Sequence, residues 1–130
     1  MKRMSLRRFG ELVARVLETL PEGLRPYLEN VVVDVQEEPD EELLREQGFT
    51  EEEIAEGATL YGLFVPFPLP NTEALDCTEV PHRILIFKRP LEEDFPDRHE
   101  LRQEIRKTVI HELGHHFGLN EHDLKKLGLE

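Results

Sequence analysis

The chain has 130 residues, of which 34% are charged, and its formal net charge is −12. This length fits one domain spanning residues 1–130, and the negative charge argues against nucleic acid as a partner, because phosphate binding needs clustered Lys and Arg. No apolar run approaches membrane-spanning length and the start lacks a signal-peptide pattern, so we expect a cytoplasmic protein with no membrane partner. The single Cys77 is expected to be a small apolar residue in a reducing compartment. The scarcity of Asn, Gln, Cys and Met hints at a thermophilic source.

Apolar periodicity near the start predicts an amphipathic helix over residues 6–20, ended by Pro21. The β-branched run at residues 31–35 predicts a strand. Two short helices are expected within residues 40–57 on either side of Gly48, and the acidic residues there are interpreted as a solvated face.

The second half of the chain predicts two further strands and a long helix. Residues 60–65 and 83–87 are apolar and short, and each is followed by proline, at Pro66 and Pro90. A helix is expected over residues 98–117. The pattern as a whole predicts an α+β fold, with a short mixed sheet of about three strands, an N-terminal helix and a helix that carries the site.

The chemistry is concentrated on that long helix, in the segment His-Glu-Leu-Gly-His at residues 111–115. His111 and His115 are four residues apart, so their rings lie within about 40° of each other around the helix and can converge on one ion. Glu112 is rotated by about 100° from His111, where it can reach a water on that ion without being a ligand. Two imidazoles that hold zinc and a carboxylate that takes a proton are the requirements of metal-assisted hydrolysis.

Residues beyond the motif strengthen it. Gly118 follows His115 by three residues, where glycine permits a sharp turn, and Glu121 follows by six. Requiring these positions as well lowers the chance of an accidental match to roughly one in a thousand. Asn120 is expected to cap a last short helix, which places Glu121 and His122 in its first turn. Spacing favours Glu121 as the third ligand and residue type favours His122, so both alternatives stay open here.

The segment from His111 to Glu121 resembles the zincin clan and, more closely, the minimal metalloproteases, or zincin-like metallopeptidases. The resemblance implies a zincin-like fold, with His111, His115 and Glu121 as zinc ligands and Glu112 as the general base. It implies a zinc-dependent metallopeptidase that hydrolyses peptide bonds through a zinc-activated water. Peptides or unfolded proteins would be its substrates.

The chain departs from the larger metzincins, which place His at the position of Glu121 and have a methionine turn after the motif. Only nine residues follow Glu121. We therefore expect restricted peptide cleavage, with a protein partner or a second copy of the chain completing the cleft.

The alternatives to a peptidase are a zinc-binding interaction module without catalysis and a zinc hydrolase of non-peptide substrates. Glu112 favours catalysis, because a module that only held the metal would not need it.

Four other residues receive an interpretation from the sequence. His116 shares a helix face with apolar residues and is expected to face the core or support the ligands. His82 and His99 are expected at the surface. Tyr61 is expected to be a structural aromatic rather than a donor to an oxyanion.

Overall fold

The computed structural model describes residues 4–66 and 81–126. In this part of the chain three strands form one mixed sheet: β1 (Val31–Gln36), β2 (Gly62–Val65) and β3 (His82–Phe87). The strand β3 is central, with β1 parallel to it on one side and β2 antiparallel to it on the other. The α+β class and the three-stranded mixed sheet expected from the sequence are therefore confirmed.

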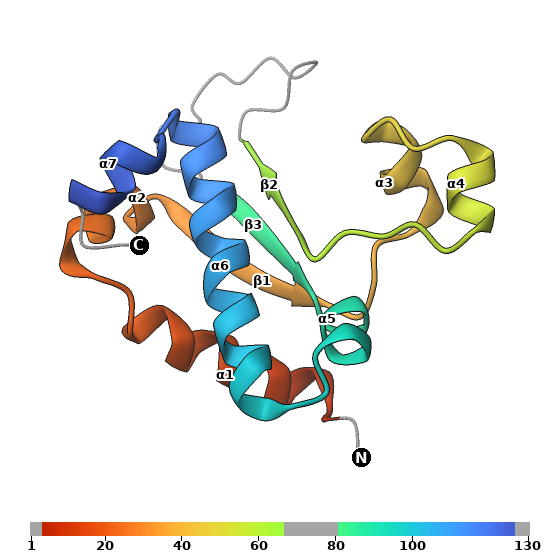
Figure 1. The fold of residues 1–130 in the computed structure, drawn as a ribbon, viewed down its shortest axis with the longest axis horizontal. Coiled ribbons are helices and arrows are strands. Elements are labelled where there is room, and N and C mark those ends of the chain that lie inside the picture. The colour runs from red at the N-terminus through yellow and green to blue at the C-terminus, as the bar shows by residue number, and fades with distance from the viewer. Residues whose placement is uncertain (1–3, 67–80, 127–130) are drawn as a thin grey trace.

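Two helices, α1 (Leu6–Glu18) and α6 (Arg98–Phe117), pack together against the sheet. Figure 1 shows α6 lying across the strands with α1 near its lower end. Ile84 and Ile86 of β3 are fully buried in the core that these elements share. The other buried members of this core are Phe9, Leu12, Val13, Val16, Leu20, Leu24, Leu91, Leu101, Ile105, Val109 and Leu113. None of the described helices combines the length and the apolar character needed to cross a membrane.

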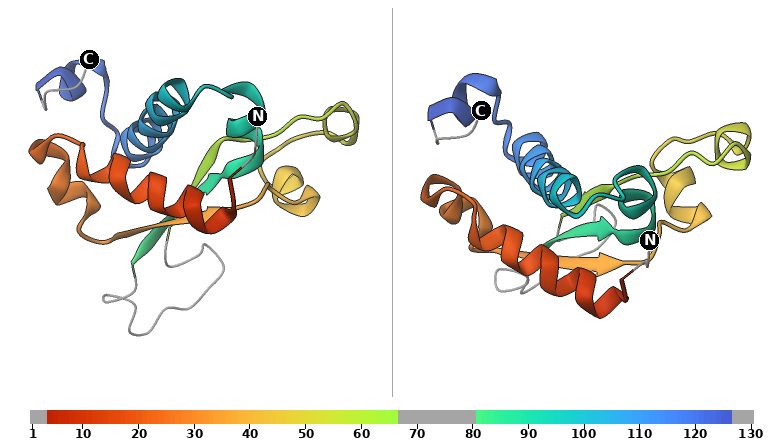
Figure 2. Two further views of the ribbon diagram at one scale, coloured as in Figure 1. Left: turned by 90° about the horizontal axis from the view of Figure 1, so that it is seen from below. Right: turned by 60° about the horizontal axis from the view of Figure 1, so that its bottom comes forward.

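Short helices connect and flank these layers. They are η1 (Glu22–Leu24), α2 (Arg25–Leu28), α3 (Glu41–Glu46), α4 (Glu51–Ala55), α5 (Lys88–Asp94) and α7 (Glu121–Lys126). The pair α3 and α4 confirms the two short helices expected around Gly48, and Thr50 and Glu53 form the capping box at the start of α4. In both views of Figure 2 the α3–α4 segment and α7 lie at opposite ends of the molecule.

The sequence pattern does not predict helix α5, because a proline at position 90 indicates the end of the preceding strand. In the structure β3 leads directly into α5, and Pro90 occupies the third position of that helix. Proline is tolerated in a first helical turn, whose N–H groups lack intrahelical partners. Lys88, at the first position, is buried and pairs with Glu37 and Glu92, at 2.8 and 2.9 Å. Burial alone would lower the pKa of Lys88, but its hydrogen bonds to the two carboxylates raise it.

Candidate metal centre

Helix α6 sets the orientation of the motif. It begins at the N-cap Asp97, whose side chain accepts a hydrogen bond from the amide of Glu100, and ends at Gly118, which has a left-handed φ of 69°. Four of its five buried residues recur every four positions, at Leu101, Ile105, Val109 and Leu113, and Gly114 is the fifth. Because this stripe faces the sheet and α1, the rotation of α6 is fixed and the motif histidines are directed elsewhere.

His111 and His115 lie together on the exposed side of α6, with ring centroids 6.2 Å apart. With Zn–N bonds of about 2.0–2.1 Å, two imidazoles on one tetrahedral zinc have centroids about 5 Å apart. The exposed side chains would therefore need to approach by about 1 Å, which rotation about their side-chain bonds can supply. The two histidines fit as a pair of zinc ligands.

Glu112 joins α6 to β2, which is an edge strand of the sheet found within residues 4–66 and 81–126. Its Oε1 accepts a hydrogen bond of 2.7 Å from the backbone N–H of Phe64, and its side chain is half-buried. The contact fixes one carboxylate oxygen beside the histidine pair.

The register of the sheet explains why the amide of Phe64 is available. The amide of Phe87 donates to the carbonyl of Tyr61, and the two strands pair antiparallel with Phe64 opposite Ile84. In an antiparallel pair, hydrogen-bonded and non-hydrogen-bonded positions alternate. The peptide groups of Gly62 and Phe64 consequently point away from β3, toward the outer edge of the sheet.

Gly62 lets β2 approach α6 closely. A Cβ atom at this position would lie 2.6 Å from Cγ2 of Thr108 and 3.0 Å from the carbonyl oxygen of Leu85. Both distances are shorter than ordinary contacts, so a larger residue would push the strand away from the helix. The glycine therefore helps to bring the outer edge of β2 within reach of Glu112.

Two neighbouring hollows flank this junction, with volumes of about 350 and 410 Å³. Both are lined by Leu60, Gly62, His111 and Glu112. The first also reaches Leu63, Phe64, His115 and His116, and the second reaches Tyr61, Glu104, Lys107 and Thr108. The motif residues thus lie between two recesses that follow the edge strand.

Glu121 lies apart from this arrangement. It is exposed in the first turn of α7, where it lines a different hollow with Asn120, His122 and Lys125. Asn120 caps α7 as expected, through a 2.8 Å bond from the amide of Asp123 to its side chain. Within residues 4–66 and 81–126, no three His, Cys, Asp or Glu side chains are close enough to hold one metal ion. The choice of Glu121 or His122 as third ligand stays a prediction.

Tyr61 has a structural contact that explains its place. Its hydroxyl donates a hydrogen bond to Asp94, and its ring meets Phe95 edge to face at 5.7 Å. The hydrogen bond to Asp94, together with partial burial, raises the pKa of Tyr61 to about 12. This agrees with the interpretation of Tyr61 as a structural aromatic.

The structure contradicts one of the two positions expected for His116, that facing the core; a supporting role for the ligands stays a prediction. His116 is exposed, and its ring stacks on Phe64 with centroids 3.8 Å apart and planes 15° from parallel. The position of His116 around the helix would place it on the buried face, but at this end α6 extends beyond the last buried residues of that face. Partial desolvation and, to a smaller degree, the neighbouring His82 lower the pKa of His116.

The expectation of a surface position holds for His99, which is exposed, but only partly for His82. His82 begins β3, is half-buried, and lies 5.2 Å from the ring of His116. No local pattern in the sequence signals this proximity, because it depends on the packing of α6 over the sheet. The interpretation of Cys77 falls outside the described residues.

Comparisons with known proteins address the fold and the family of the chain. A solved structure of a conserved hypothetical protein from Thermus thermophilus is 22% identical and has a TM-score of 0.56, over 88% of this chain and 94% of that one. At this identity the likeness shows a shared fold. No curated protein matches the chain. The profile of the zincin-like metallopeptidases matches residues 28–129, a range that includes both β2 and the whole motif on α6. The chain therefore belongs to the zincin-like metallopeptidase family.

Proposed function

We propose that the protein is a zinc-dependent peptidase, in which His111 and His115 hold the metal and Glu112 acts as general base. The observation that carries the proposal is the position of Glu112, beside the histidine pair and against the outer edge of β2. A bound zinc ion would supply Lewis acidity, which polarises a carbonyl group and lowers the pKa of water. Glu121 is the third ligand in this proposal; it lines a different hollow from the histidine pair, so α7 would have to approach the pair when zinc binds.

The contact with Phe64 suits a general base. A carboxylate has two oxygens, and the bond from the Phe64 amide holds Oε1. The second oxygen can then accept a proton while the side chain keeps its place. A base that is positioned in this way typically contributes about 10²- to 10⁴-fold to the rate.

The edge strand supports a peptide as substrate. The carbonyl groups of Gly62 and Phe64 and the amide of Gly62 face outward, by the alternation described above. An extended peptide could add to this edge through main-chain hydrogen bonds, with its side chains in the two hollows. The hollows are open, so a protein partner or a second copy of the chain that completes the cleft remains part of the proposal.

A peptide-library screen tests this function. Zinc-loaded protein should cleave extended peptides, a chelator should abolish cleavage, and added zinc should restore it. The His99→Ala variant is a suitable control, because His99 is an exposed histidine of the same helix outside the motif. Bound zinc without cleavage of any peptide would favour a zinc-binding interaction module without catalysis. Hydrolysis of small non-peptide esters alone would favour a zinc hydrolase of non-peptide substrates.

A further inference from the structure

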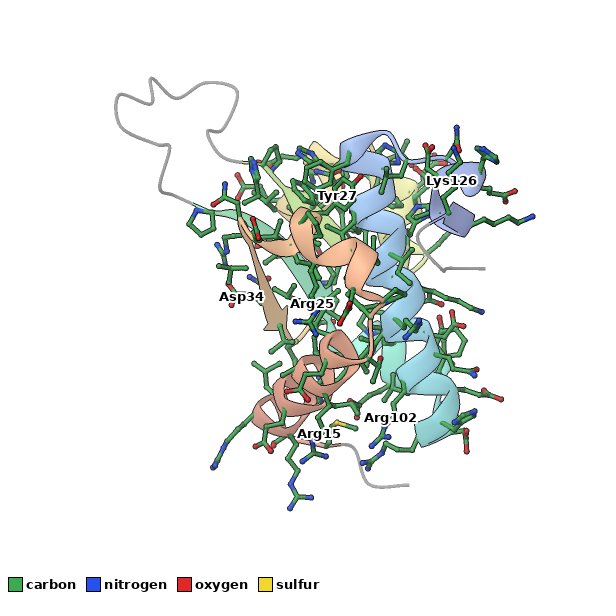
Figure 3. The ribbon with its side chains drawn as sticks, turned by 90° about the vertical axis from the view of Figure 1, so that its left-hand side faces the viewer. Arg15, Arg25, Tyr27, Asp34, Arg102 and Lys126 are labelled. Atoms are coloured by element: carbon green, nitrogen blue, oxygen red, sulfur yellow. The ribbon has the colours of Figure 1, made fainter. Side chains whose placement is uncertain are left out.

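A separate hollow lies between α1 and α6, away from the motif, and has a volume of about 290 Å³. Its polar lining consists of basic and neutral side chains: Arg15 and Thr19 from α1 and its C-cap, and His99, Arg102, Gln103 and Arg106 from α6. Figure 3 shows Arg15 of α1 and Arg102 of α6 close together in the lower part of the view.

The charge of this hollow is opposite to that of the protein. Of the residues that the structure describes, three arginines line the hollow and no carboxylate does, although the chain carries a formal net charge of −12. Among the described residues, neither Arg15 nor Arg102 has an ion-pair partner. Arg102 and Arg106 are also four residues apart on α6, where like charges repel. An anion in the hollow would relieve this repulsion.

Part of the lining is already held in place. Nη1 of Arg106 donates to the carbonyl oxygen of Thr19 at 2.9 Å and to its hydroxyl at 3.1 Å. These bonds fix the guanidinium and leave its Nε and Nη2 without a hydrogen bond to any described residue. The side chains of His99 and Gln103 lie 3.4 Å apart at their Nε2 atoms. A planar guanidinium held in this way loses little conformational freedom when it binds an oxyanion.

The hollow is distinct from the metal centre. Arg102 precedes His111 by nine residues and Arg106 precedes His115 by nine, so each arginine is rotated by about 180° from the corresponding histidine around α6. The two sites therefore occupy opposite sides of one helix.

We propose that this arginine-lined hollow is a binding site for a small phosphate-bearing molecule, whose phosphoryl group would bridge α1 and α6. Three guanidinium groups match a dianion better than the single charge of a carboxylate. The volume lies near the lower end of ligand pockets, roughly 300 Å³, which suits free phosphate or a small phosphomonoester rather than a dinucleotide.

Calorimetric titration tests the site, with inorganic phosphate, phenyl phosphate and acetate as probes at one ionic strength. Both phosphate probes should bind saturably and acetate should not. Equal affinity for the two phosphate probes would identify inorganic phosphate as a sufficient ligand of the hollow. Tighter binding of phenyl phosphate would identify a phosphomonoester as the preferred ligand. Absence of saturable phosphate binding, or equal binding of acetate, would overturn the proposal.

Paired variants assign the binding to the hollow rather than to zinc or to overall charge. In Arg15→Gln/Arg102→Gln, phosphate affinity should fall by at least about tenfold, because two charge-assisted contacts are lost. The matched control Arg8→Gln/Arg98→Gln removes the same charge from exposed residues of the same two helices and should bind as the parent does. All four arginines are exposed, so thermal unfolding should show intact folds. If phosphate affinity falls equally in the two double variants, or falls in neither of them, the hollow is not the binding site.

Discussion

The carboxylate of Glu112 accepts a hydrogen bond of 2.7 Å from the backbone amide of Phe64, which lies 48 residues earlier in the chain. This contact joins the helix that carries the motif to the outer edge of the sheet. It requires that β2 be an edge strand, that the Phe64 amide face outward, and that Gly62 permit close approach to α6. The proposed base is thus positioned by the fold and not by the motif alone.

The close approach of β2 and α6 predicts a specific rescue. Gly62→Ala should lower the free energy of unfolding by about 1–3 kcal/mol, because its Cβ would overlap the methyl group of Thr108. Thr108→Ser removes that methyl and keeps a hydroxyl for the 2.7 Å bond to the carbonyl of Glu104. The double variant should recover part of the loss in chemical denaturation, although the carbonyl of Leu85 remains close. If Gly62→Ala lowers the free energy of unfolding equally in the parent and in Thr108→Ser, then Thr108 does not limit how closely β2 approaches α6.

The histidine pair predicts zinc content. The parent should carry about one zinc per chain, and His111→Ala or His115→Ala should remove it, since each variant loses one of the two converging imidazoles. Elemental analysis after dialysis measures the effect, with His99→Ala as the control that should keep its metal. Full zinc occupancy in both motif variants would mean that the metal binds elsewhere.

Much of this arrangement follows from local sequence, and some of it does not. Helix α6 is long, periodic and capped at Asp97 and Gly118, so its limits and the common face of His111 and His115 could be predicted. The contact between Glu112 and Phe64 could not, because it depends on which strand lies at the edge of the sheet. Helix α5 is not predictable from the sequence, because Pro90 is as compatible with the end of a strand as with the first turn of a helix.

The third ligand can be decided by comparing two adjacent residues. Zinc dissociation constants of Glu121→Ala and His122→Ala should differ, because adjacent side chains of a helix diverge by about 100° and only one can face the metal. We expect the larger loss for Glu121→Ala, exceeding the roughly 10- to 100-fold typical of residues that only support a ligand. A large loss of zinc affinity in His122→Ala alone would reverse the assignment. Parental zinc affinity in both variants would exclude Glu121 and His122 as ligands.

The bond between Tyr61 and Asp94 predicts a pH dependence. The pKa of Tyr61 is about 12 in the folded protein, against about 10 for an unfolded tyrosine. Its contribution to stability should therefore be full below about pH 10 and be lost as the pH rises toward about 12. The difference in ultraviolet absorbance between the parent and Tyr61→Phe, followed during alkaline titration, should show this late ionisation. A midpoint near pH 10 in the folded protein would contradict the bond.

The most direct test of the proposed catalysis compares Glu112→Gln with the parent, in zinc content and peptide cleavage. Glutamine keeps a side-chain oxygen that can accept the Phe64 amide, so the fold and the metal should be retained. It cannot accept a proton at neutral pH, so the cleavage rate should fall by about 10²- to 10⁴-fold. Full zinc content with this loss of rate is the result that we predict. Cleavage by Glu112→Gln at the parental rate would contradict the account.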